Sequence, residues 1–300
     1  MDKSLLEDCS LCPRECHVDR TGGERGYCGM TEELMVARAA LHYWEEPCIS
    51  GEKGSGTVFF SGCSMGCVYC QNRSIAKGLA GKAITIDRLA EIFLELQNKG
   101  AENINLVTPS HYVPQIKEAL ILAKGKGLTI PIVYNCSGYE KPETLRLLEG
   151  YIDIFLPDLK YRDPKPATRY SSCTDYFERA AAAISEMVRQ VGEPVYDERG
   201  MMKRGVIVRH LTLPGYLKDS KRILEYLYGT YGDRILISIM NQYTPLETVR
   251  DYPEINRRIR DEEYEELVDY AIELGIENGF IQEGETASES FIPEFNNEGV

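Results

Sequence analysis

A chain of 300 residues, 43% of them hydrophobic, can bury a full core, so disorder is excluded and one barrel-sized domain with a small appendage is expected. The formal net charge of −13 disfavours nucleic acid and membrane surfaces as partners, because both bind clustered Lys and Arg. No stretch has the roughly 18 apolar residues of a membrane span, and the start lacks a secretory signal, so we expect a cytoplasmic protein. In that reducing compartment the ten cysteines are free to bind metals.

The first 30 residues are rich in Cys, Gly and charged side chains and show no apolar period, so a hydrophobic core cannot hold them together. They contain four cysteines in the spacing C-x2-C-x3-C-x11-C: Cys9, Cys12, Cys16 and Cys28. Four thiolates can bind zinc, which would fold the segment, or a second 4Fe-4S cluster, which could pass electrons; the spacing does not choose between them. We therefore expect residues 1–50 to form a small metal-binding knob beside a main domain at residues 51–300.

Beyond residue 50, short β-branched runs alternate with longer amphipathic stretches, which is typical of parallel strands joined by helices. Strands are expected at residues 57–62, 103–108, 130–135, 151–156, 205–211 and 234–240. Helices are expected at residues 86–99, 112–125, 142–149, 174–191, 219–229 and 261–275. Thr85 and Asp87 favour a helix start, and Gly100 favours a helix stop. The pattern predicts an α/β fold, either a barrel or a doubly wound sheet.

Polar or metal-binding residues lie at or just past the ends of these expected strands. They are Cys63, Thr108, Asn135, Asp158, Lys160, His210 and Asn241. In barrels and in doubly wound sheets alike, chemistry collects at the carboxyl ends of the strands. We therefore expect these side chains to converge on one rim and to form the active site.

The loop after the first expected strand carries three cysteines within eight residues: Cys63, Cys67 and Cys70. Thiolates are soft ligands that suit iron–sulfur clusters, and three of them leave the fourth iron of a cubane open to another ligand. The alternatives are a zinc site that borrows a fourth ligand, or plain buried thiols. Zinc ligands usually come as separated Cys-x-x-Cys pairs, and no second pair follows in this region, so the spacing favours a cluster.

The spacing C-x3-C-x-aromatic-C, with Tyr69 at the aromatic position, resembles the signature of the radical S-adenosylmethionine (SAM) superfamily. The segments CSMGCVYCQN and IFLPDLKY resemble the pyruvate formate-lyase activating enzyme group within that superfamily. The resemblance covers roughly residues 55–285, and the N-terminal four-cysteine motif is similar to that of an uncharacterised iron–sulfur branch of the same group.

This resemblance implies a partial (β/α)6 TIM-like barrel in which SAM binds the open iron of a 4Fe-4S cluster through its amino and carboxylate groups. It also implies that the reduced cluster cleaves SAM to methionine and a 5′-deoxyadenosyl radical, which abstracts hydrogen from a substrate. A glycyl-radical protein is the substrate that activating enzymes suggest. A one-electron reductant such as flavodoxin or ferredoxin is the other partner implied.

The resemblance also suggests which side chains contact SAM. Tyr69 would lie beside the adenine, although packing beneath the loop is the alternative. Asp158 and Lys160 match the Asp-x-Lys pattern that holds the SAM methionine or ribose, and residues two apart in an extended segment share a face. An ordinary ion pair at a strand end is the competing interpretation.

Four further positions match less closely. Asn135 and Ser137 would reach SAM hydroxyls or its carboxylate, and His210 could contact the ribose. Turn formation and a structural histidine are the alternatives. After the second strand, activating enzymes carry a Gly-Gly-Glu stretch that holds the SAM amino group, whereas this chain has VTPSHY. Of that segment we assign only Thr108 to SAM.

Two alternative functions remain. One is a radical SAM enzyme that modifies a peptide or a small molecule. The other is a non-catalytic iron–sulfur electron carrier, which would need a fourth protein ligand for the loop cluster. Cys136 is the nearest candidate for that ligand, whereas Cys48 and Cys173 are expected to be buried thiols.

Overall fold

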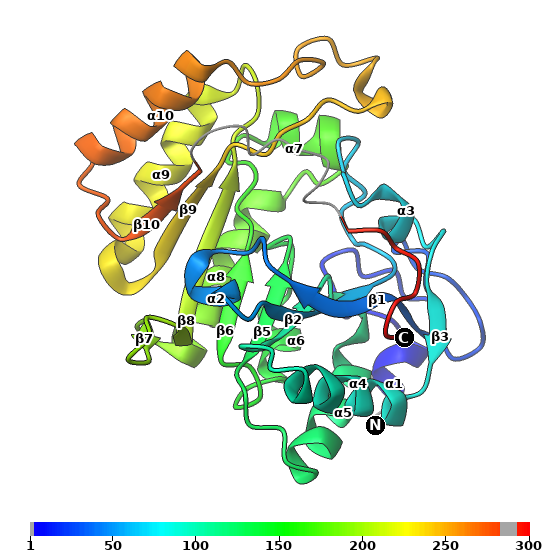
Figure 1. Cartoon of the computed structure of the whole chain (residues 1–300). Helices are drawn as coiled ribbons and strands as arrows, with labels where there is room; N and C mark the ends of the chain where they lie inside the picture. Colours follow the sequence, from blue (N-terminus) through cyan, green and yellow to red (C-terminus); the bar gives the residue numbers. More distant parts are fainter. Residues whose placement is uncertain (1–2, 283–292) are drawn as a thin grey trace.

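Ten strands form one sheet in the computed structural model, which describes residues 3–282 and 293–300 (Figure 1). The strand order is β10-β9-β8-β6-β5-β4-β2-β1-β3, and β7 pairs with β8 beside this path. The sheet does not close, because β10 and β3 lie at its two ends. The expected fold class, an α/β partial TIM-like barrel, is confirmed.

The central strands run parallel to one another. They are β2 (Ser55–Phe60), β4 (Ile104–Val107), β5 (Ile132–Cys136), β6 (Ile154–Pro157), β8 (Met202–Leu211), β9 (Leu236–Met240) and β10 (Gly279–Ile281). Every residue of β2, β5 and β6 is buried, as in a sheet covered on both faces. The six strands expected from the sequence are all present.

Three antiparallel strands were not expected: β1 (Leu34–His42), β3 (Lys82–Ile84) and β7 (Val195–Tyr196). β1 pairs with β2 along most of its length, so the main sheet already includes residues before 50. The expected boundary at residue 50 stays a prediction. The last residues of the chain lie alongside β1, where the backbone N–H of Ala39 donates to Glu298 O at 2.8 Å.

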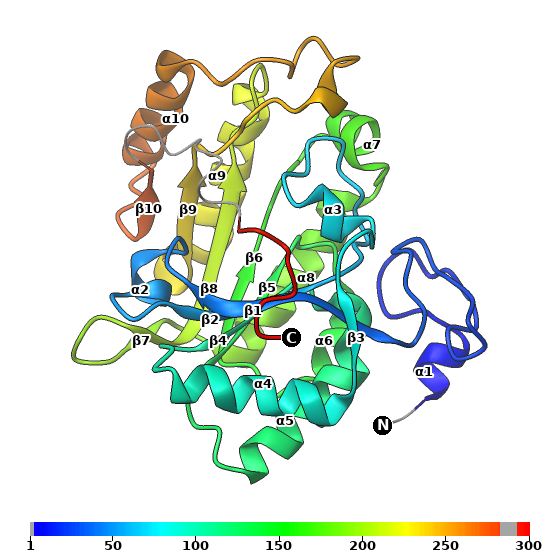
Figure 2. The same ribbon diagram turned by 45° about the vertical axis from the view of Figure 1, so that its right-hand side comes forward.

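The long helices are the expected ones, and the pairs α4–α5 and α9–α10 lie side by side (Figures 1 and 2). The helices are α1 (Ser4–Glu7), α2 (Pro47–Ser50), α3 (Arg73–Ala76), α4 (Ile86–Asn98), α5 (Val113–Gly125), α6 (Pro142–Arg146), α7 (Pro164–Ser171), α8 (Tyr176–Val191), α9 (Leu217–Tyr231) and α10 (Asp261–Glu273). Thr85 caps α4 by accepting from Arg88 N, and Gly100 follows its end with a φ of +88°, as the sequence predicted. No helix in the described ranges is long and apolar enough to cross a lipid bilayer.

The N-terminal segment, residues 3–33, consists of loops and the single short helix α1 beside the β3 end of the sheet (Figure 2). Its own apolar cluster contains only Leu6, Cys9 and Leu11 as buried members. Arg20 is fully buried and donates to the Thr31 and His111 carbonyls, both at 2.6 Å, so it ties the segment to the barrel. Attachment to the barrel therefore contributes more to its order than a core of its own.

Candidate active site

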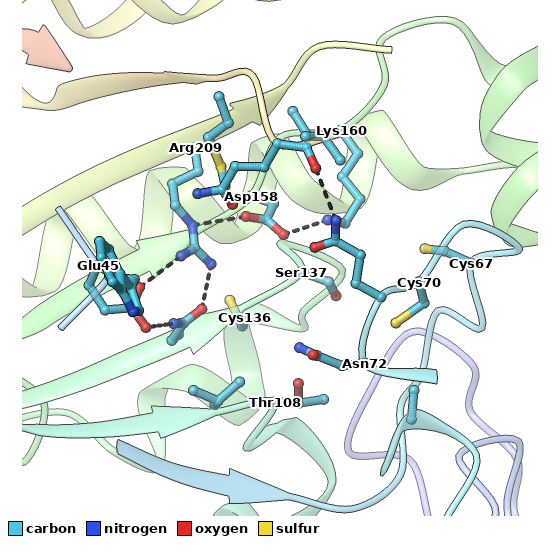
Figure 3. A pocket seen from close by; sticks show the side chains of 18 of the residues that line it. Glu45, Cys67, Cys70, Asn72, Thr108, Cys136, Ser137, Asp158, Lys160 and Arg209 are labelled. Atoms are coloured by element: carbon cyan, nitrogen blue, oxygen red, sulfur yellow. Dashed lines mark hydrogen bonds and ion pairs between the residues drawn. The ribbon is translucent and has the colours of Figure 1, made fainter. Parts of the chain in front are cut away.

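A cavity of about 490 Å³ lies over the carboxyl-terminal halves of the parallel strands (Figure 3). Ligand pockets commonly have this size. Nine of the predicted site residues line it: Cys63, Cys67, Tyr69, Cys70, Thr108, Asn135, Ser137, Asp158 and Lys160. Of the seven residues expected to converge on one rim, Cys63, Thr108, Asn135, Asp158 and Lys160 line the cavity, whereas His210 and Asn241 are not among the described lining residues.

The three-cysteine loop follows β2 directly and forms one end of the cavity (Figure 3). Gly62 and Gly66 have φ values of +93° and +67°, which let the loop turn sharply twice. The Ser171 hydroxyl donates to Cys67 Sγ at 3.0 Å. Burial raises the pKa of Cys70 to about 12 and also raises the pKa of Cys67. Thiolates at these positions therefore need a neighbouring cation, which a bound metal supplies.

Tyr69 is buried, although it lines the cavity. Its hydroxyl is hydrogen-bonded to the Tyr161 hydroxyl, which in turn pairs with Ser171 Oγ at 2.8 Å. The Tyr69 ring meets Tyr243 edge-on, with 5.9 Å between the centroids. What Tyr69 can offer a ligand is therefore its ring or its backbone, and its hydroxyl belongs to a chain that ends at Cys67.

Arg209 organises the charged side of the cavity, although the sequence analysis did not select it. Its guanidinium donates to Asp158 at 3.1 Å, to Glu45 at 3.2 Å and to Asn135 at 2.6 Å. Lys160 is ion-paired with the other oxygen of Asp158. Burial alone would raise the pKa of Asp158, but Lys160 and Arg209 outweigh burial and hold that pKa below its usual value. Asp158 and Lys160 thus share one face, as their spacing predicted.

Two further carboxylates, Glu45 and Glu46, come from the segment between β1 and α2 and were also missed. Glu45 binds Arg209 on β8, and Glu46 accepts a hydrogen bond from Ser238 on β9. The local pattern, a Glu-Glu pair before a proline, gives no hint of this position. It results from β1, which carries the segment across the sheet to β8 and β9 (Figures 1 and 2).

His210 does not reach the cavity. Its Nδ1 pairs with Leu159 O and its Nε2 with Ser220 Oγ, both at 2.8 Å, and burial lowers its pKa to about 4. Successive residues of a strand point to opposite faces, so only one of Arg209 and His210 can face a ligand there. The structure brings Arg209 to the cavity and directs His210 toward α9.

Thr108 lines the cavity in the region where activating enzymes carry their Gly-Gly-Glu stretch. Its φ of +58° is unusual for a β-branched residue, and its N–H donates to Asn135 O at 2.9 Å. Ser110, the other hydroxyl of this segment, is turned away and donates to buried Glu140 at 2.6 Å. Thr108 is therefore the hydroxyl that this segment offers to a ligand.

The four N-terminal cysteines lie close enough to influence one another electrostatically, and burial raises the pKa of Cys12 to about 12. Tyr27 N donates to Cys16 Sγ at 3.2 Å. Within residues 3–282 and 293–300, however, no three His, Cys, Asp or Glu side chains are placed to hold a single metal ion. Metal binding by either cysteine set therefore stays a prediction.

Arg14 connects the two cysteine-bearing regions. It lies between Cys12 and Cys16 and donates to Ser64 O in the three-cysteine loop at 2.8 Å. The same guanidinium donates to Ser172 O at 2.6 Å and stacks 3.8 Å from the Tyr27 ring centroid. The N-terminal segment therefore contacts the very loop that borders the cavity.

Residues 57–227 match the family model described as "Radical SAM superfamily", which covers more than half of the chain. This chain belongs to the radical SAM superfamily. The family implies a 4Fe-4S cluster and SAM as cofactors. The membership also confirms the superfamily that the three-cysteine spacing predicted.

Three further proteins are similar to this chain. Over 281 residues the radical SAM chain is 29% identical to the uncharacterized protein MJ0674 of Methanocaldococcus jannaschii, covering 90% of this chain and 75% of that protein. A structure of Streptococcus suis SuiB bound to S-adenosylmethionine aligns with a TM-score of 0.50 at 16% identity, covering 76% of this chain and 52% of SuiB. The FeFe-hydrogenase maturase HydG of Carboxydothermus hydrogenoformans aligns with a TM-score of 0.46 at 14% identity, covering 79% of this chain and 59% of HydG. This chain thus spans about half of SuiB.

The residues present fit what a radical SAM enzyme must bind. Three thiols border one end of the cavity, and thiolates are the ligands that iron–sulfur clusters prefer. Beside them lie the ammonium of Lys160 and the hydroxyls and amide of Thr108, Ser137 and Asn135. A SAM molecule carries a carboxylate, an ammonium and ribose hydroxyls, and this mixed set can pair with each of them.

Proposed function

We propose that this chain reductively cleaves SAM on a 4Fe-4S cluster held by Cys63, Cys67 and Cys70 and thereby removes hydrogen from a substrate. The observation that supports this most is the joint placement of the three thiols and the strand-end polar residues around one cavity. When bound, the reduced cluster supplies the electron that splits SAM into methionine and the 5′-deoxyadenosyl group that accepts the hydrogen.

The proposal gives each remaining residue a task. The ammonium of Lys160 attracts the SAM carboxylate. Asp158 keeps the Lys160 ammonium charged and oriented. Burial alone would lower the pKa of Lys160, but Asp158 outweighs burial and raises it, so the side chain stays a cation. Thr108 and Ser137 offer hydroxyls to the amino acid part of SAM or to its ribose.

Asn135 and Tyr69 have fewer groups to offer a ligand, because part of each side chain is already hydrogen-bonded within the protein. Asn135 has its side-chain oxygen engaged by Arg209, and its NH₂ donates to Glu45 Oε1 at 3.5 Å, so one N–H of that amide is left to face a ligand. The Tyr69 ring can pack beside the adenine, because its hydroxyl is already bonded to Tyr161. His210 acts through Leu159, whose carbonyl it binds, and so positions the segment that carries Asp158 and Lys160.

The substrate that the activating-enzyme resemblance suggests is a glycine in a partner protein, with flavodoxin or ferredoxin as reductant. The resemblance of the IFLPDLKY segment to that of activating enzymes supports this finer assignment. The N-terminal cysteines Cys9, Cys12, Cys16 and Cys28 are proposed to bind zinc or a second cluster, since their spacing supplies four thiolates and the burial of Cys12 and Cys28 favours a neighbouring cation.

Anaerobic reconstitution, one-electron reduction and quantification of 5′-deoxyadenosine and methionine test the proposal. Wild type should form both products, Cys67→Ala should form neither, and Cys48→Ala should match wild type because Cys48 packs in a separate apolar cluster. An intact reduced cluster that yields no product in wild type would overturn the proposal and favour an electron carrier.

A further inference from the structure

Among the described residues, the cavity is lined by one more carboxyl group than cationic side chains. Besides cysteines and tyrosines, the charged side chains that line it are Glu45, Glu46, Asp158, Lys160 and Arg209. His42 also lines it, but burial and then Arg38 lower its pKa to about 4, so it is neutral near pH 7. Three carboxyl groups against two cations leave one carboxyl group without an ion pair among the described residues, and burial raises the pKa of both Glu45 and Glu46.

The carboxyl group without an ion pair is Glu46. Arg209 divides its donors among Asp158, Glu45 and Asn135, and Lys160 is paired with Asp158. Glu46 is 9% exposed, and its Oε2 has no hydrogen-bond partner within the described residues. A buried carboxylate oxygen without a partner is costly, so this site gains free energy when a donor or a cation arrives.

Glu46 lies at the end of the cavity away from the cysteines. Its hydrogen-bond partner Ser238 is on β9, five strands along the sheet from β2. Figure 3 shows the adjacent Glu45 across the cavity from Cys67 and Cys70, with Arg209 and Asp158 between. A SAM molecule bound at the cysteines has its own ammonium at their end, so Glu46 is left to the substrate.

Trp44 extends the same site toward solvent. It lines the cavity, it is 56% exposed, and it directly precedes the Glu45–Glu46 pair. The face of an indole ring attracts ammonium and guanidinium groups, with an energy of about 0.5–2 kcal/mol. Trp44 and Glu46 thus line one cavity, and a carboxyl group together with an aromatic ring is a combination that binds organic cations.

We propose that Glu46 and Trp44 bind a cationic group of the substrate, a primary ammonium or a guanidinium, at the cavity end away from Cys63, Cys67 and Cys70. This inference deepens the proposed function and rests on it. The substrate class is thus a molecule that presents a positively charged nitrogen several ångströms from the carbon that loses hydrogen. Peptide side chains and small amines both carry such groups.

The single tryptophan of the chain makes binding directly measurable. Butylammonium, butylguanidinium, butyramide and butyrate are titrated into reconstituted, SAM-bound protein while Trp44 emission is followed. Both cations should give saturable changes, and the amide and the anion should bind at least roughly tenfold more weakly, as expected when a charged hydrogen bond is missing. Equal affinity for butylammonium and butyramide in wild type would overturn the proposal without any variant.

Glu46→Gln should weaken butylammonium binding roughly tenfold, whereas exposed Glu52→Gln should not change it. Unchanged binding in Glu46→Gln would also overturn the proposal. A pentapeptide with one lysine that binds more tightly than butylammonium would support a peptide substrate, and equal affinity would support a small amine. Because fluorescence reports binding and 5′-deoxyadenosine reports cleavage, failure of one proposal can be told from failure of the other.

Discussion

The two cysteine-bearing regions differ in what positions them. The loop with Cys63, Cys67 and Cys70 follows a fully buried parallel strand, so the sheet itself fixes its place at the cavity. The N-terminal segment has no strand and a small apolar cluster, and it depends on contacts such as Arg20 and Arg14 with the barrel. A group of cysteines can thus be positioned by a strand of the sheet or by contacts with the sheet from outside it.

The largest expected effect is a difference in SAM cleavage between variants of the three-cysteine loop and variants of the N-terminal cysteines. Cys67→Ala should abolish SAM cleavage, because the cluster loses one of three ligands, whereas Cys12→Ser should lower cleavage only in part. The measurement is 5′-deoxyadenosine formed per reduced protein. Equal and complete loss in both variants would show that the N-terminal set is as necessary to the chemistry as the loop.

Arg14→Ala should destabilise the protein by about 3 kcal/mol, because the charged side chain donates to carbonyls of both the loop and the α7–α8 connection. Urea unfolding gives this value, and the absorption spectrum of the reconstituted cluster reports the loop. Arg25→Ala is the matched control, since Arg25 bonds only Gly29 O within its own exposed turn. If both variants lose the same stability, Arg14 does not link the two regions.

Gly62→Ala should cost about 2 kcal/mol, since an added Cβ would come within 2.5 Å of Met30 Cγ and 3.0 Å of Cys28 O. Gly23→Ala isolates the backbone contribution: Gly23 has a similar φ of +91° but nothing within 4 Å of its Cβ position. Adding Met30→Ala to Gly62→Ala should recover part of the loss. The measurement is thermal unfolding of wild type, the two single variants and the double variant. Equal melting temperatures for Gly62→Ala and Gly23→Ala would show that the clash with Met30 and Cys28 does not cause the loss of stability.

Glu140 lies in the loop between β5 and α6, where Lys141 also pairs with Glu15 of the N-terminal segment at 2.6 Å. Burial raises the Glu140 pKa from 4.5 to about 7. The unfolded chain therefore loses this proton first, and stability should fall by about 1 kcal/mol per unit as pH rises from 5 to 7. Glu140→Gln should make the thermal unfolding midpoint less dependent on pH. A wild-type midpoint that is constant between pH 5 and 7 would contradict the prediction.

The smallest expected effect concerns the alternative fourth ligand. Cys136 is 3% exposed, and its thiol interacts with Glu140. Cys136→Ala should leave both iron content and SAM cleavage near the wild-type level. Loss of the cluster in this variant would support the electron-carrier hypothesis.

Much of the barrel and of the cavity could be predicted because both follow from local patterns. Buried parallel strands produce continuous apolar runs, and polar residues at their ends share one edge, which placed Cys63, Asn135 and Asp158 correctly around the cavity. The sequence prediction selected His210 instead of its neighbour Arg209. Which of the two side chains faces the cavity depends on which face of β8 the fold buries. Glu45 and Glu46 were missed because their place depends on β1, whose pairing with β2 is not encoded near them.

The antiparallel strand β1 also has a practical consequence for expressing the protein. A fragment cut at the family boundaries, residues 57–227, would lose β1 and β9 and would expose the hydrogen-bonding groups of β2 and β8 along two bare edges. Such edges pair with other copies of a chain and lead to aggregation. Fragments intended to stay in solution should therefore begin before Leu34 and extend past β10, so that β1, β9 and β10 are retained.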